Sequence, residues 1–324
     1  MRSKGGVMIG LGKKETQFYL FAGKGGVGKT SIAAATALFY SNAGKKTLII
    51  STDPAHSLAD SFETKIGGDI VKVNKNLFAV EIDPQKAMSE YKEKLAPKMD
   101  KIDFLKGLDL GDAFDFAGNT PGIDELAAFD KFLQYMQSKE YDIIVFDTAP
   151  FGHTIRFLSL PDLLDSWVGK MISIRLKLAG VMNTFKKLLP FGEDEGDTKL
   201  GTEELEKIKN RIAEARTILG DRKRTHFNLV MIPEAMSIYE SERSVKILGE
   251  YGIPVYSVFV NQLIPDNRKC VFCSERRKVQ QERLKEIRNK FRGLEILQIP
   301  LYKKEVKGLE MLEAVGKGLY GKRA

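Results

Sequence analysis

The residues Gly23-Lys24-Gly25-Gly26-Val27-Gly28-Lys29-Thr30 decide the fold of this 324-residue chain. They match the pattern G-x-x-x-x-G-K-[ST], whose glycines let the backbone curl so that successive N–H groups point at phosphates. An apolar run precedes them at 17–22 and an Ala-rich segment follows at 31–43, which predicts a strand, a loop and a helix. The start of the helix adds its positive dipole end to the loop. The sequence therefore predicts a site for the phosphates of a nucleotide.

Two lysines in this loop have different predicted roles. We expect Lys29 to reach the β- and γ-phosphates of ATP, while the Thr30 hydroxyl binds Mg²⁺. Lys24 gives the loop the deviant Walker A form G-K-G-G-x-G-K-T. In proteins of that kind this lysine acts catalytically on the nucleotide of a partner subunit, as an arginine finger does; the alternative is that it only adds positive charge near the phosphates. The predicted nucleotide-binding residues of this segment are Gly23, Lys24, Gly25, Gly26, Val27, Gly28, Lys29, Thr30 and Ser31.

Strand and helix patterns alternate along the rest of the chain. Short apolar runs predict further strands at 47–51, 77–82, 141–146, 225–232, 255–260 and 294–299. This alternation predicts an α/β fold with a mostly parallel sheet flanked by helices. We expect a single P-loop ATPase domain at 16–324 after a flexible start at 1–15, with helical insertions at about 88–121 and 161–221 that form a subdomain.

Two carboxylates follow predicted strands. Asp53, in the stretch S-T-D-P-A-H-S at 51–57, lies where ligands bind in such sheets and could orient or deprotonate the attacking water; the alternative is an ordinary Asx-Pro turn. Asp147 ends the run Y-D-I-I-V-F-D, a Walker B pattern, and is expected to hold Mg²⁺ through water. His153, in the loop beyond it, has either a direct role in a switch or a packing role.

Composition excludes several classes of protein. There is no apolar run of about 18 residues and no apolar segment near the start, so we expect a cytoplasmic protein without a membrane span. The net charge of +8 is spread over mixed-charge segments, and we expect no nucleic-acid partner. Two cysteines exclude a disulfide scaffold.

An apolar face is predicted at helical spacing over residues 171–189. It could pack on the core of the domain, lie on a membrane, or line a groove for apolar partners, for which its methionines are suited. The upstream stretch 88–116 carries a second apolar set.

Together, 23–30, 51–57 and 147–156 resemble the arsenical-pump ATPase family, and within it the branch that targets tail-anchored membrane proteins. Ile232-Pro233-Glu234, Val260-Asn261-Gln262 and Pro300-Leu301-Tyr302 agree with it. The resemblance implies that Asn261 and the loop with Pro300 and Tyr302 hold adenine, and that Glu234 approaches the nucleotide across a dimer. One departure is Ser57, where that branch often has Asn.

The resemblance also implies a function. A homodimer closes around two Mg·ATP, shields the transmembrane helix of a tail-anchored protein in an apolar groove, and releases it at a membrane receptor after hydrolysis. Two alternatives stay open: an ATPase that energises arsenite export, which needs cysteines that this chain lacks, and a partitioning or positioning ATPase with the same deviant loop.

Cys270-Val271-Phe272-Cys273 is expected in a polar loop after a strand. Tetrahedral Zn²⁺ needs four ligands, and a homodimer supplies four thiolates on its two-fold axis. The targeting branch has such a pair, which favours shared zinc over a redox dithiol or a chance pair.

Overall fold

A computed structural model describes residues 15–52, 57–83, 86–87, 89–90, 131–148, 210 and 213–321. Its centre is an eight-stranded sheet in the order β3-β4-β2-β5-β1-β6-β7-β8. All neighbouring strands run parallel except β3 and β4. The strands are β1 (Gln17–Gly23), β2 (Thr47–Ser51), β3 (Val71–Asn74), β4 (Leu77–Glu81), β5 (Ile143–Asp147), β6 (Thr225–Met231), β7 (Val255–Leu263) and β8 (Glu295–Pro300).

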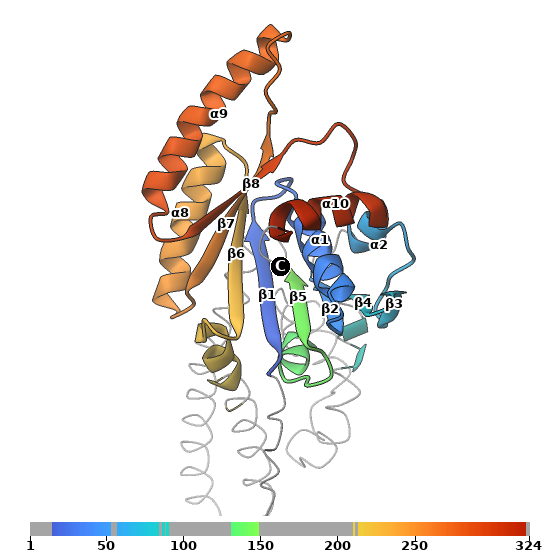
Figure 1. Ribbon diagram of the computed structural model, residues 1–324. Helices are drawn as coiled ribbons and strands as arrows, with labels where there is room; N and C mark the ends of the chain where they lie inside the picture. The colour runs from blue at the N-terminus through green and yellow to red at the C-terminus, as the bar shows by residue number, and fades with distance from the viewer. Residues whose placement is uncertain are drawn as a thin grey trace, which may run out of the picture.

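Helices cover the two faces of this sheet. On one face α1 (Lys29–Asn42), α2 (Ser57–Phe62) and α10 (Gly308–Tyr320) bury one apolar cluster. On the other, α8 (Ala235–Glu250), α9 (Val271–Lys290) and the helical residues 131–136 and 213–220 bury a second. In Figure 1, α1 and α10 lie together in front of the central strands, whereas α8 and α9 run beside β6 to β8.

The structure confirms the predicted α/β fold and its parallel strands, with ends that shift by up to three residues. Helix α1 begins at Lys29, two residues earlier than predicted, because Gly28 already turns the chain into it. The antiparallel edge strand β3 was not predicted; only four residues long, it is too short to give a clear alternation pattern. The predicted insertions lie almost wholly outside the described residues and stay predictions. Within the described ranges, no helix is both long and apolar enough to cross a membrane.

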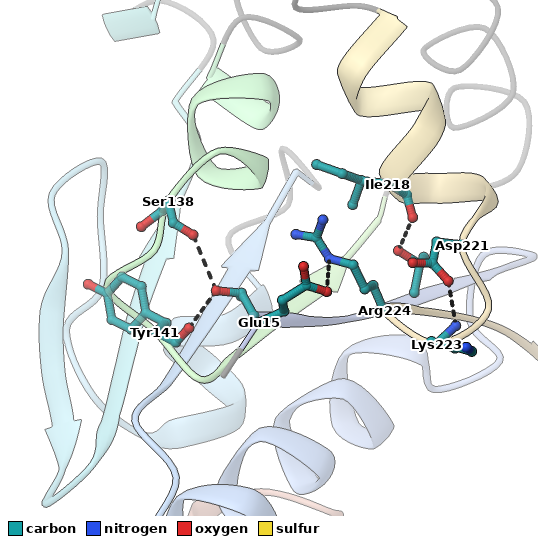
Figure 2. A network of polar contacts seen from close by, with 9 residues as sticks. Glu15, Ser138, Tyr141, Ile218, Asp221, Lys223 and Arg224 are labelled. Atoms are coloured by element: carbon teal, nitrogen blue, oxygen red, sulfur yellow. Dashed lines mark hydrogen bonds and ion pairs between the residues drawn. The ribbon is translucent and has the colours of Figure 1, made fainter. Parts of the chain in front are cut away.

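Side chains tie together the amino ends of the three central strands (Figure 2). The hydroxyl of Thr16, just before β1, donates to the carbonyls of Ser138 and Tyr141, just before β5, at 3.4 and 2.8 Å. Across β1 on the other side, Arg224 Nε lies 3.6 Å from a carboxylate oxygen of Glu15. These contacts fix where β1, β5 and β6 begin, and thus which residues reach the opposite edge of the sheet.

Helices α1 and α10 approach each other unusually closely at Gly316. A Cβ atom built on Gly316 would lie 2.8 Å from the carbonyl oxygen of Ala35 in α1. Gly318, on the same helix, would bring its Cβ no nearer than 3.8 Å, to the Tyr302 hydroxyl. Only the first glycine is therefore required by packing.

We expect Gly316→Ala to lower the free energy of unfolding by about 1–2 kcal/mol, since the backbone of α1 must move to admit the methyl group. Gly318→Ala is the matched control, and its gain in helix propensity should raise stability by about 0.5 kcal/mol. Urea unfolding of both variants measures the difference. Equal effects of the two substitutions would contradict the close packing.

His226 of β6 is stacked between two tyrosines. Its ring centroid lies 4.6 Å from that of Tyr19 and 4.1 Å from that of Tyr256. Burial lowers the pKa of His226 from its ordinary value, because the charged imidazolium loses its hydration. The ring is therefore neutral at pH 7 in the folded chain.

This lowered pKa makes stability depend on pH. Between the pKa of an unfolded histidine, about 6.5, and the lower folded value, the unfolded chain takes up the proton first, so stability falls as the pH decreases. We expect His226→Phe to lose less stability than the natural chain when the pH goes from 7.5 to 5.5. Urea midpoints at the two pH values measure this, and an identical loss in both proteins would contradict it.

Candidate nucleotide-binding site

The P-loop lies at the carboxyl edge of the sheet, between β1 and α1. Gly28, the residue before α1, has φ of +88°, and a Cβ there would lie 2.4 Å from the amide nitrogen of Asn261. Gly23, at the end of β1, would bring a Cβ to 2.2 Å from the carbonyl oxygen of Val230 in β6. Both positions therefore require glycine, one for its backbone conformation and one for close approach.

Lys29 and Thr30 start α1, as the sequence predicted. Lys29 is buried, and its Nζ donates to the carbonyl oxygen of Lys24 at 3.3 Å, across the curl of the loop. The hydroxyl of Thr30 shares a hydrogen bond with the hydroxyl of Ser57, at 3.1 Å. The second contact brings the start of α2 directly to the P-loop.

Asp147 ends β5 beside the loop. This strand lies between β1 and β2, and Asp147 is in register with Phe21 on one side and Ser51 on the other. The residue is fully buried, and the backbone N–H of Thr52 donates to its carbonyl oxygen at 3.0 Å. The Walker B position thus meets the strand that leads into the Asp53 segment.

A cleft of about 960 Å³ opens beside these residues. Three segments far apart in the sequence form it: the P-loop, α2 with the turn after it, and the loop that follows β8. Its lining consists of Gly25, Gly26, Gly28, Lys29, Thr30, Ser31, Ser57, Ala59, Asp60, Ser61, Glu63, Thr64, Lys65, Glu305, Val306 and Lys307. The predicted phosphate-binding residues therefore border a space large enough for a nucleotide.

The predicted adenine contacts lie close to the P-loop but in different settings. Asn261 donates its amide hydrogen to the carbonyl of Val27 at 2.9 Å and accepts from the backbone N–H of Gln262 at 2.8 Å. Pro300 ends β8, Tyr302 lies two residues further on, and neither is among the described residues that line the cleft. The contact of all three residues with adenine stays a prediction, and Asn261 in addition holds the loop.

Both residues expected to act across a dimer are held here by ion pairs within the chain. Lys24 Nζ lies 3.2 Å from Oε1 of Glu240 in α8. Glu234, the residue before α8, accepts a 2.8 Å hydrogen bond from Arg276 of α9. All four side chains are two fifths or more exposed, so these pairs are weak and exchangeable. Sequence reasoning missed Glu240 and Arg276, because no motif marks them.

Glu81 is a third site residue that sequence reasoning missed. It ends β4 and is almost fully buried, and its Oε1 accepts from the backbone N–H groups of Leu58 and Ala59 at 2.9 and 3.1 Å. The carboxylate therefore caps the first turn of α2, where a negative charge is favourable. A glutamate at the end of a buried strand run was the available signal.

The cysteine pair is at the start of a helix, and the predicted polar loop was wrong. Cys270 is the residue before α9, and its Sγ accepts from the backbone N–H of Cys273 at 3.2 Å. Hydrogen bonding from Cys273 lowers the pKa of the Cys270 thiol, while the same contact raises that of Cys273. The intervening Val271 and Phe272 are both more than 70% exposed.

The described residues include candidate ligands for Mg²⁺ and for zinc. The hydroxyls of Thr30 and Ser57, with the carboxylate of Asp147 at the end of the strand next to β1, are oxygen donors of the kind that Mg²⁺ prefers. No group of three or more His, Cys, Asp or Glu side chains that could hold a metal exists in the described part of the chain. Cys270 and Cys273 are two free thiols, whereas zinc needs four ligands, so the shared zinc site stays a prediction. The predicted Asp53 and His153, with His56, lie outside the described residues.

The sheet, the P-loop and the Walker B aspartate define this protein as a P-loop ATPase of the deviant Walker A class. The family model described as anion-transporting ATPase matches residues 16–321, and the chain belongs to that family. The ATPase GET3C of Arabidopsis thaliana is 40% identical over 323 residues, covering 93% of this chain and 82% of that protein. The ATPase GET3 of Podospora anserina is 36% identical (94% and 90% covered), as is the ATPase get3 of Schizosaccharomyces pombe (94% and 91%). The chain is an ATP hydrolase, as the sequence predicted.

Proposed function

We propose that this ATPase is a targeting factor for tail-anchored membrane proteins. A homodimer closes on two Mg·ATP, shields the transmembrane helix of its client in an apolar groove, and releases it at a membrane receptor after hydrolysis. The family membership supports the ATPase cycle, and the resemblance of the switch segments to the targeting branch supports the client. The cytoplasm is the proposed place of action.

One observation carries the dimer in this proposal. Lys24 and Glu234, the two residues expected to act in trans, both lie on the exposed border between the P-loop and α8. On the first turns of α8, Met236 is 62% exposed and Tyr239 is 57% exposed. Apolar side chains beside exchangeable charges are typical of a surface that another subunit covers.

Each site residue has a role in the proposed cycle. Lys29 neutralises charge on the bound phosphates, Thr30 binds Mg²⁺, and Asp147 orients the metal's water shell. Asp53 orients or deprotonates the attacking water, and Lys24 of the partner stabilises the charge that develops on the transferred phosphoryl group. Zinc held by Cys270 and Cys273 from each subunit would join the dimer outside the nucleotide sites.

The alternative of an arsenite-pump ATPase is less supported. Soft metalloids need several thiolates, and the full sequence holds only Cys270 and Cys273.

If Lys24 acts in trans, Glu240 competes with the partner's phosphates for it. Glu240→Gln should lower the protein concentration needed for ATP-dependent dimerisation about 1.5- to 5-fold, as expected for loss of an exposed ion pair. Analytical ultracentrifugation with ATP and without it measures the shift.

Glu242→Gln is the matched control for that variant. It removes the same charge from α8. Glu242, however, pairs with Lys290 of α9 at 2.6 Å and not with a lysine of the P-loop. It should leave dimerisation unchanged. A Glu240→Gln protein that behaves like the Glu242→Gln protein would show that the Lys24 pair does not limit closure.

The client is tested with a synthetic tail-anchored segment and the variant Asp53→Asn. This substitution keeps the size of the side chain but removes the carboxylate, so we expect ATP binding to persist and turnover to fall by at least about 100-fold. The ATP-bound variant should keep the apolar segment in solution, and the ADP-bound protein should not. Light scattering of the segment and phosphate release, recorded together, measure both properties.

The two outcomes separate the parts of the proposal. If the variant binds ATP but the segment precipitates as it does alone, the client is wrong and the ATPase stands. If Asp53→Asn hydrolyses ATP at the natural rate, the assignment of the water-activating residue is wrong.

A further inference from the structure

Ser57 stands where the targeting branch often has Asn, and the structure places it against the predicted metal ligand. Its Oγ lies 3.1 Å from Oγ1 of Thr30. Both residues line the cleft of about 960 Å³. Ser57 is half-buried, so its hydroxyl is neither a free surface group nor part of the core.

The spacing of these two hydroxyls fits one metal ion. Mg²⁺ holds six oxygens at about 2.1 Å in an octahedron, which sets neighbouring ligands about 3 Å apart. The Thr30–Ser57 separation of 3.1 Å is therefore that of two adjacent ligands. Two hydroxyls that share a hydrogen bond each keep lone pairs that a cation can accept.

The position of Ser57 is fixed by groups outside the cleft. Glu81 accepts from the backbone N–H groups of Leu58 and Ala59, the two residues that follow Ser57. Glu81 is almost fully buried at the end of β4, and Leu58 is fully buried in the core beneath α2. The hydroxyl is thus held beside Thr30 by the fold, and no movement of α2 is needed to bring it there.

We propose that Ser57 is a direct Mg²⁺ ligand, adjacent to Thr30 in the coordination sphere. The proposal rests on the Mg·ATP site proposed above and adds a ligand from the segment that also carries Asp53. A metal bound by Ser57 ties this switch segment to the P-loop when Mg·ATP is present. When the metal leaves with the cleaved phosphate, the switch segment is no longer linked to the P-loop through it.

A different role for Ser57 would give a different metal response. If its hydroxyl only orients Thr30 through the hydrogen bond, or contacts the nucleotide itself, the residue affects binding without choosing the metal. A ligand that touches the metal, by contrast, changes which metals the site prefers, because thiolate favours soft ions and hydroxyl favours hard ones.

The test is the metal dependence of nucleotide binding, followed by the fluorescence of a labelled ATP analogue on the full chain. Ser57→Ala should raise the Mg²⁺ concentration for half-maximal binding about tenfold or more, as expected when a metal site loses a partner. Ser57→Cys should do the same with Mg²⁺ but recover tight binding with Cd²⁺. The natural chain carries the same Cys270 and Cys273, so the difference between the two proteins reports on position 57 alone.

Ser138 provides the control. It is half-buried, as Ser57 is, but it lies just before β5 at the amino edge of the sheet and does not line the cleft. Ser138→Ala and Ser138→Cys should follow the natural chain with both metals. Binding of the analogue in EDTA, unchanged across all variants, shows that the P-loop is still folded.

Three results would overturn the proposal. Ser57→Ala could need no more Mg²⁺ than the natural chain, Ser57→Cys could gain nothing from Cd²⁺, or Ser138→Cys could gain equally. If the natural chain itself binds the analogue without regard to Mg²⁺, the metal site as a whole is wrong, which is a separate failure.

Discussion

The structure depends on a tight closure around the P-loop. The loop leaves β1 at Gly23, which lies so close to the carbonyl of Val230 in neighbouring β6 that no side chain fits. It then turns into α1 through the left-handed conformation of Gly28, and Asn261 of β7 holds the Val27 carbonyl beside that turn. Three strands therefore fix one loop. Because these contacts hold the loop backbone in place, its N–H groups are already arranged for phosphate binding before any nucleotide arrives.

Much of this arrangement could be predicted from the sequence, because the glycine pattern and the buried strand runs have direct physical causes. Thr30, Lys29 and Asp147 lie at the carboxyl edge of the sheet, where its parallel strands end. The partner of Lys24 could not be predicted, because Glu240 is an ordinary glutamate until the fold brings α8 to the loop. The cysteine pair was misplaced for a related reason: a polar stretch after a strand predicts a loop, but nothing in its composition excludes an exposed helix, and α9 is one.

The ion pairs around α8 suit both a single subunit and the proposed dimer of this ATPase. Lys24 and Glu234 belong to different elements, and each has an alternative partner within its own chain. Such pairs contribute little to stability, because water screens them. In the proposed dimer, such pairs would keep both charged groups partnered while the second subunit is absent, and the groups could exchange partners at small cost when it binds.

The close packing of α10 on α1 has a consequence for motion. Because Gly316 admits the backbone of α1 at the distance of direct contact, the two helices are joined over their length and move as one body. Helix α1 carries the P-loop at its amino end, so the loop inherits the stiffness of this pair and of the sheet beneath it. Helix α2 packs in the same apolar cluster as α1 and α10, and buried Glu81 holds its first turn, so α2 belongs to this rigid body. The loop meets α8, by contrast, through the exposed Lys24–Glu240 pair, which is weak. In mechanical terms, the P-loop with α1, α2 and α10 is the fixed jaw of a clamp, and the surface at Lys24 is where the clamp can open.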